Sequence, residues 1–148
     1  MIRLWRSDDR GSRWQVYLEH EAQNPWLAMA LPPAPGSRPY NSGVFGIGSR
    51  IFRPSGSRRV EGRVSPHEPA ILDLVYVPSS GKEYHLYAAT AEGIFVSRDQ
   101  GKAWKSYNEG LPEEPILSLV ASPEYQRDKL LYALSLGGVL WRREVNEG

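Results

Sequence analysis

Serine and aspartate recur at one fixed spacing in two short stretches, and this spacing suits either acid–base chemistry or a tight turn. The octets "SDDRGSRW" and "SRDQGKAW" contain Ser7, Asp9, Gly11 and Trp14, and Ser97, Asp99, Gly101 and Trp104. An aspartate on a loop could act as a reactive acid or base. The same side chains can instead bond to backbone N–H groups of their own loop, while glycine supplies the positive φ. We favour structural turns whose Trp side chains pack inward, and assign neither aspartate a catalytic role.

A cluster of arginines is the second group that could bind a ligand. It comprises Arg50, Arg53, Arg58, Arg59 and Arg63, with Glu61 as the acidic residue among them. Such a concentration of positive charge can attract a carboxylate, a phosphate or an acidic protein surface. The alternative is a solvated loop, and we keep these five arginines as candidate binding residues beside it.

Other titratable residues give weaker indications. The three histidines, His20, His67 and His85, share no spacing typical of a metal site. Glu113 and Glu114 follow Glu109 closely, and paired carboxylates can serve a glycosidase. Adjacent residues of an extended strand point to opposite sides, however, so this run fits a solvated turn better. We expect no metal, no cofactor and no catalytic residue, and a phosphate-binding glycine loop is absent from the sequence.

A repeat of 45 residues organises the chain around these groups. "AILDLVYVP" and "PILSLVASP" place Ile71 and Ile116 45 positions apart, and Leu86-Tyr87-Ala88 stands 45 before Leu131-Tyr132-Ala133. Gly93-Ile94 maps in the same way onto Gly138-Val139, and "WLAMALPP" from Trp26 supplies a third copy. The two octets lie 90 positions apart, which is two repeats.

The repeat predicts short β-strands and little helix. In the third copy we expect strands at 70–77, 84–90, 93–98 and 103–108, because runs rich in Val, Ile, Leu, Tyr and Phe alternate with turn residues. "PEYQRDK", 123–129, is the best helical candidate, and we expect a loop or a single turn there. Several short strands in a period of 40 to 50 residues are typical of a β-propeller blade.

Composition excludes several classes of protein. With 41% hydrophobic and 24% charged residues, the 148-residue chain has the balance of a soluble globular domain. A formal net charge of +1 does not favour nucleic acid or an anionic membrane as partner. The sequence shows neither a membrane-spanning apolar run nor a signal peptide, so the chain as written would be cytoplasmic. Its compartment stays open, because a protein without cysteine is viable in any redox compartment. The absence of cysteine excludes disulfides and thiolate metal sites.

The octets, placed between the third and fourth strands of the repeat, resemble the Asp-box or BNR motif. Such motifs occur in sialidases, sortilin-type receptor domains, xyloglucan-degrading glycosidases and propeller-type photosystem II assembly factors, and "SPEYQRD" is similar to a connection in bacterial members. The resemblance implies that the boxes are structural and lie away from any substrate face. Two copies depart from the pattern: "FRPSGSRRVEG" has no aspartate in place, and "WRREVNEG" offers Arg142 and Glu144 where Ser and Asp would stand.

We therefore expect an all-β partial propeller of about three four-stranded antiparallel blades within one domain, 1–148. Residues 1–22 would form strands C and D of a first blade, 23–66 a degenerate blade, 67–110 a blade, and 111–148 a blade without its last strand. Because propellers close with four to eight blades, we expect completion by a second copy or by another chain, or else that the sequence is a piece of a longer gene. The predicted function is a non-enzymatic binding or scaffold module for protein–protein assembly. The alternative is a fragment of a sialidase- or xyloglucanase-like glycoside hydrolase.

Overall fold

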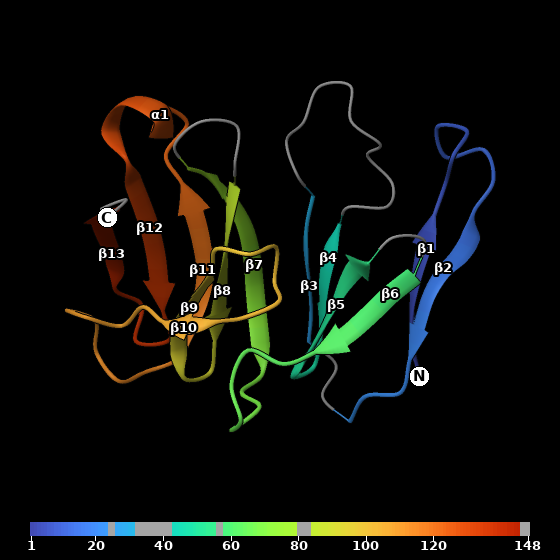
Figure 1. The fold of residues 1–148 in the computed structure, drawn as a ribbon, viewed down its shortest axis with the longest axis horizontal. Coiled ribbons are helices and arrows are strands. Elements are labelled where there is room, and N and C mark those ends of the chain that lie inside the picture. Colours follow the sequence, from blue (N-terminus) through green and yellow to red (C-terminus); the bar gives the residue numbers. More distant parts are fainter. Residues whose placement is uncertain (24–25, 32–42, 56–57, 80–83, 146–148) are drawn as a thin grey trace.

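The structure is built from four antiparallel β-sheets (Figure 1). The computed structural model describes residues 1–23, 26–31, 43–55, 58–79 and 84–145. The first sheet pairs β1 (Ile2–Arg6) with β2 (Gln15–His20), and the second contains β3 (Leu27–Ala30), β4 (Val44–Ile47), β5 (Arg50–Ser55) and β6 (Arg58–Gly62).

The C-terminal half forms two further sheets. The third contains β7 (Ile71–Pro78), β8 (Tyr84–Thr90), β9 (Gly93–Ser97) and β10 (Lys105–Ser106), and the fourth contains β11 (Ile116–Ala121), β12 (Leu130–Ser135) and β13 (Leu140–Glu144). Helix α1 (Tyr125–Asp128) joins β11 to β12. Within each sheet, every strand pairs with the next one along the chain, as in a meander.

The prediction of an all-β fold built from antiparallel sheets is confirmed. Strands β7, β8 and β9 begin within one residue of the expected positions, and α1 is the single turn expected in 123–129. The expected strand 103–108 is shorter, because the octet turn holds the chain as far as residue 104. After β10, the Tyr107 N–H still donates to the Ile94 carbonyl at 2.8 Å. The Asn108 side chain then accepts from the Ile94 N–H at 2.7 Å, so an amide replaces the backbone ladder.

The four sheets stack in chain order and share a hydrophobic cluster at each junction. One cluster, with Leu4 and Phe52, joins the first sheet to the second. A second cluster, with Ile51 and Leu86, joins the second sheet to the third, and another, with Tyr87 and Leu131, joins the third to the fourth. Strand β7 contacts both β3 and β11, so the first strands of these three sheets are neighbours.

One short motif accounts for the regularity of this stack. Strands β1, β5, β9 and β13 each carry an aliphatic residue followed by an aromatic one, namely Leu4-Trp5, Ile51-Phe52, Ile94-Phe95 and Leu140-Trp141. Successive side chains of a strand point to opposite faces. At the internal junctions the aliphatic member therefore packs toward the following sheet, and the aromatic member packs toward the preceding one.

Candidate functional site

The two octets fold into matching hydrogen-bonded loops. In the second octet Ser97 Oγ donates to Asp99 Oδ1 at 2.8 Å and accepts from the Gly101 N–H at 2.8 Å. Asp99 Oδ1 also accepts from the Ala103 N–H at 2.9 Å, and Trp104 Nε1 donates to the Gly101 carbonyl at 3.1 Å. Both aspartates thus act as acceptors for backbone groups of their own loops, because the first octet repeats these contacts.

In the first octet the Ser7 hydroxyl donates to the Asp9 carboxylate and accepts from the Gly11 N–H. The Arg13 N–H donates to the same carboxylate, and Trp14 Nε1 donates to the Gly11 carbonyl. Backbone geometry agrees as well, since φ is 87° at Gly11 and 88° at Gly101. A side chain is strained at such angles, which explains why glycine stands at both positions.

The backbone hydrogen bonds also set the charge state of these loops. A backbone N–H donated by Arg13 is the main cause that lowers the pKa of Asp9, and one donated by Ala103 lowers that of Asp99. Hydrogen bonds to the ionised form favour it over the neutral acid. A general acid at neutral pH needs the opposite shift, so this geometry favours a structural role for both carboxylates.

Ser97→Ala is expected to destabilise the fold by about 1–3 kcal/mol, because the buried Gly101 N–H would lose its acceptor. Ser7→Ala is the matched control: the same bond at Gly11 is exposed, and water can replace it. Urea unfolding of both variants measures the difference. Equal losses would contradict a role for burial at the second loop.

Acid is expected to weaken both loops. Because folding lowers the pKa of Asp99 below the reference value of 3.8, its contribution to stability is present above that value and is lost as pH falls through the lower folded pKa. We expect the free energy of unfolding to fall below about pH 4, and to fall less in Asp99→Asn. Urea midpoints across the acid range test this, and an unchanged pH dependence in the variant would refute it.

The five candidate arginines do not form one surface. Arg50 pairs with Glu61 at 3.5 Å, and both Arg50 and Arg63 pair with Glu68, at 3.0 and 3.3 Å. The sequence pattern predicted Glu61 among the arginines but did not predict the contacts of Glu68. Arg58 is exposed at the start of β6.

The other two arginines extend from the second sheet in different directions, Arg53 toward the third sheet and Arg59 toward the first. A Cβ placed on Gly101 of the third sheet would lie 3.7 Å from Arg53 Cδ. The Arg59 guanidinium lies 4.5 Å from the Tyr17 ring centroid and 4.7 Å from that of Phe45, and donates to the Gly43 carbonyl and to the Tyr17 hydroxyl. Burial lowers the pKa of Arg59. Arg59 therefore acts as a tie between the first and second sheets.

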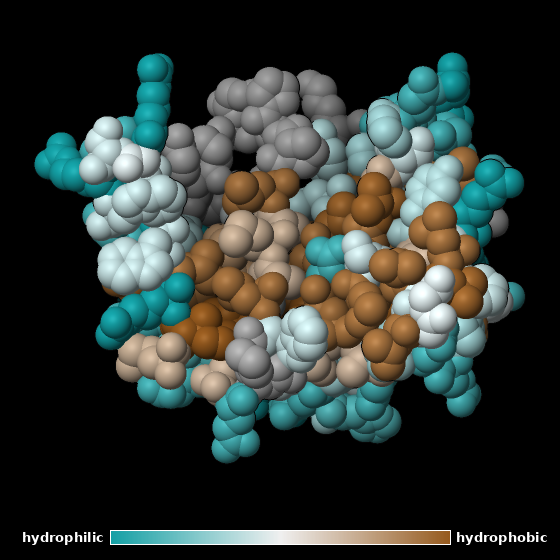
Figure 2. All heavy atoms as spheres, turned by 180° about the vertical axis from the view of Figure 1, so that it is seen from behind, coloured by the Kyte–Doolittle hydropathy of each residue, from teal (hydrophilic) through white to brown (hydrophobic). Residues whose placement is uncertain are grey.

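The outer faces of the first and fourth sheets expose residues whose counterparts are buried. Trp5 is 52% exposed, whereas Phe52 and Phe95 in the same position of β5 and β9 are buried. At the other end Leu140 is 67% exposed, whereas Ile94 is buried. We call these surfaces the Trp5 face and the Leu140 face. A broad hydrophobic area also covers the reverse side of the molecule (Figure 2).

The octet tryptophans show the same contrast. Trp104 packs against the cluster between the second and third sheets. The prediction that the octet tryptophans pack inward is wrong for Trp14, which lies in an equivalent loop but is 62% exposed on the first sheet. The loop alone therefore does not bury its tryptophan, since burial requires a preceding sheet.

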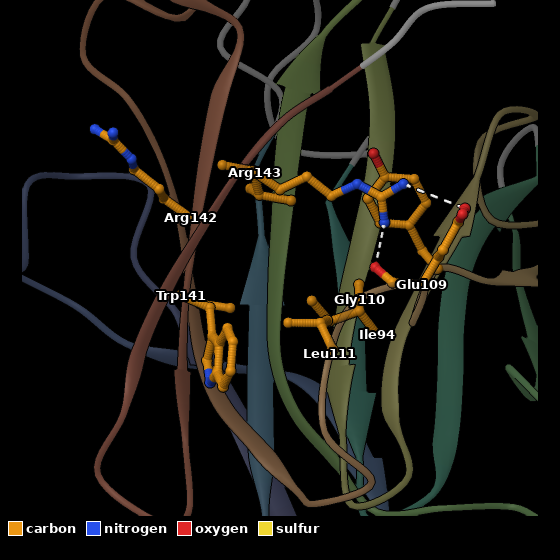
Figure 3. A pocket seen from close by; sticks show the side chains of 10 residues that line it. Ile94, Glu109, Gly110, Leu111, Trp141, Arg142 and Arg143 are labelled. Carbon is orange, nitrogen blue, oxygen red and sulfur yellow. Dashed lines mark hydrogen bonds and ion pairs between the residues drawn. The ribbon is translucent and has the colours of Figure 1, made fainter.

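A cavity of about 330 Å³ lies between the third and fourth sheets, beside β13 (Figure 3). Ile94, Leu111, Leu131, Ala133 and Trp141 contribute apolar lining. At its polar side Arg143 lies over the Tyr107 ring, 4.2 Å from the centroid, and donates to the Glu109 carbonyl at 3.0 Å. Trp141 Nε1 is buried, and no described residue accepts a hydrogen bond from it.

The remaining titratable residues do not converge into a metal site. Glu113 and Glu114 line another cavity together with Glu92, whereas Glu109 lines the cavity beside β13. His67 lies 3.5 Å from Glu92. Among the described residues, no group of three or more His, Asp or Glu side chains could hold a metal ion. No helix in the described part is long and apolar enough to span a membrane.

Asp73 is a structural residue that the sequence pattern did not single out. Its carboxylate accepts from the Leu74 N–H at 2.9 Å and, across the junction, from the Leu119 N–H at 2.8 Å. Ser118, 45 positions after Asp73, donates to the same carboxylate at 3.4 Å. The repeat carried a signal for this contact, because it places Asp73 and Ser118 at equivalent points of neighbouring strands.

Comparison with known proteins gives no further assignment: the chain matches no protein-family model, and no curated protein matches it significantly.

Proposed function

We propose that the chain is part of an Asp-box β-propeller and serves as a non-enzymatic module for protein–protein assembly. The meander sheets stacked in chain order and the paired octet loops support the propeller. In this proposal each sheet is a blade or part of one, and the second sheet is a blade whose Asp-box is lost. Residues 56–57, between β5 and β6, lie outside the described residues.

The observation that carries the assembly proposal is the exposure of the Trp5 and Leu140 faces. Every internal junction buries an aromatic residue of one sheet and an aliphatic residue of its neighbour, and the two end faces offer one of each. Exposed apolar faces of this kind mark interaction sites. A second copy of the chain, or another propeller chain, supplies the missing half of each junction.

Native mass measured by light scattering over a range of concentrations tests this proposal. We expect a multiple of the 16.7 kDa chain mass, with dissociation on dilution. A cooperatively folded monomer at every concentration, including in mixtures with other propeller chains, would overturn it. Since the two octet aspartates serve their own loops, Asp99→Asn is a suitable control that leaves both end faces unchanged.

A further inference from the structure

Strands β1 and β13 carry the same three residues in the same order. Leu4-Trp5-Arg6 lies in β1, and Leu140-Trp141-Arg142 lies in β13. In β13 this triplet pairs with β12 in the register Leu134↔Leu140, Ala133↔Trp141 and Tyr132↔Arg142. Two segments of one chain are therefore chemically suited to a single place beside β12.

The two strands differ in how their edges are occupied. In the third sheet β9 lies between β8 and β10, whereas β1 pairs with β2 alone among the described residues. Among the residues that the structure describes, β13 pairs with β12 along one edge and with no strand along the other. Unpaired strand edges offer N–H and C=O groups to another chain. Neither strand thus completes the four-stranded order found in the third sheet.

We propose that two copies of the chain assemble by strand exchange, in which β1 of one copy replaces β13 beside β12 of the other. This inference rests on the proposed function and specifies its partner as a second copy. The fourth sheet then has the order β11-β12-β1-β2, with the last two strands from the second copy. That order matches β7-β8-β9-β10 of the third sheet. Both copies exchange in the same way, which closes a two-fold dimer.

Because of the shared triplet, β1 would present Leu, Trp and Arg to β12 in the same order as β13 does. Trp5 takes the position of Trp141 against the cluster between the third and fourth sheets, and Leu4 takes that of Leu140. The three pairs that the triplet makes with β12 are replaced by pairs of the same residue types, whereas Ser7 and Asp8 would stand where Arg143 and Glu144 pair with Leu131 and Leu130. The gain therefore comes from the octet loop and β2, which are the next segments of the chain after β1.

The cavity beside β13 lies where the octet tryptophan of an exchanged hairpin would enter. Its lining residues Leu131 and Ala133 stand 45 positions after Leu86 and Ala88, which share a cluster with Trp104. Trp14 is held in the same loop geometry as Trp104 but is largely exposed. Burying it in this apolar cavity would give the fourth sheet the packing that Trp104 gives the third.

Disulfide trapping tests the register directly, because the natural chain has no cysteine. A Tyr132→Cys chain is mixed with an Arg6→Cys chain under mild oxidation. We expect a covalent heterodimer on a non-reducing gel, because exchange brings Arg6 to the place that Arg142 occupies opposite Tyr132. Tyr132→Cys with Arg142→Cys in one chain checks that this pair permits a disulfide, and Arg3→Cys replaces Arg6→Cys as the matched control.

The outcomes separate the two proposals. A dimer by native mass that gives no Arg6→Cys crosslink, or an equal Arg3→Cys crosslink, would overturn strand exchange and leave assembly through the end faces intact. A monomer at all concentrations of the chain alone would overturn strand exchange, and a monomer that also persists in mixtures with other propeller chains would overturn both proposals.

Hydrogen exchange of the unmodified chain gives a second test that needs no variant. On assembly we expect backbone amides of residues 4–6 to exchange at least about tenfold more slowly, and those of residues 140–142 to exchange faster. Continued protection of β13 in the assembled form would overturn the exchange.

Discussion

Leu119→Ala is expected to lower the free energy of unfolding by about 2–5 kcal/mol. Leu119 is 4% exposed in the cluster between the third and fourth sheets, so removing its side chain leaves a cavity. A loss of this size is a large share of the stability of a domain, about 5–15 kcal/mol. Chemical denaturation at a fixed low protein concentration measures it.

Leu140→Ala is the matched control for that result, because it is the same substitution at a residue that is 67% exposed. In dilute solution it should change stability by less than about 0.5 kcal/mol. If two chains assemble through the end faces, the effect of Leu140→Ala should grow with concentration, whereas strand exchange, which displaces β13, should leave it small. A large loss for Leu140→Ala in dilute monomer would contradict the exposure of the Leu140 face.

Trp5→Ser is expected to weaken the proposed self-assembly strongly, raising its dissociation constant by on the order of 100-fold. Trp5 is half exposed in the monomer, whereas its counterparts in β5 and β9 are buried at sheet junctions. Sedimentation or light scattering over a dilution series measures the constant.

Val60→Ser serves as the control for Trp5→Ser. Val60 is an exposed apolar residue on β6, within the stack and away from both end faces. Its substitution should leave the dissociation constant unchanged. If Trp5→Ser and Val60→Ser had equal effects, assembly would not depend on the Trp5 face.

The repeat in the sequence predicted the local structure because turns and strands depend on nearby residues. The loops around Asp9 and Asp99 are closed by contacts within a few positions, so the spacing of Ser, Asp, Gly and Trp was sufficient to predict them. The register between copies was predicted less well. Gly138-Val139 was aligned with Gly93-Ile94, but Leu140 is the residue that pairs with β12 as Ile94 pairs with β8. A longer turn between β12 and β13 accounts for the shift of one residue.

Contacts between distant segments were beyond the sequence pattern. The sequence placed only Glu61 among the arginines, because Glu68, the partner of Arg50 and Arg63, belongs to the connection after β6. The role of Arg59 depends on Tyr17, 42 positions away. The exposure of Trp5 could not be predicted either. The aliphatic–aromatic pair recurs in β1, β5, β9 and β13, but the pair alone does not show which of these strands has a preceding sheet to cover its aromatic residue.

The linear stacking of the sheets determines the order in which they unfold. Each sheet packs on its chain neighbours, so stability is approximately a sum of sheet terms and nearest-neighbour junction terms, as in a one-dimensional array. The first sheet is held by a single junction, whose cluster has fewer buried residues than the other two among the residues described. We therefore expect it to be the unit that opens most readily, and the contact of Arg59 with the Tyr17 ring to oppose this opening. The sheet that detaches first carries the hairpin that a second copy would receive, so partial unfolding and assembly would share one early step.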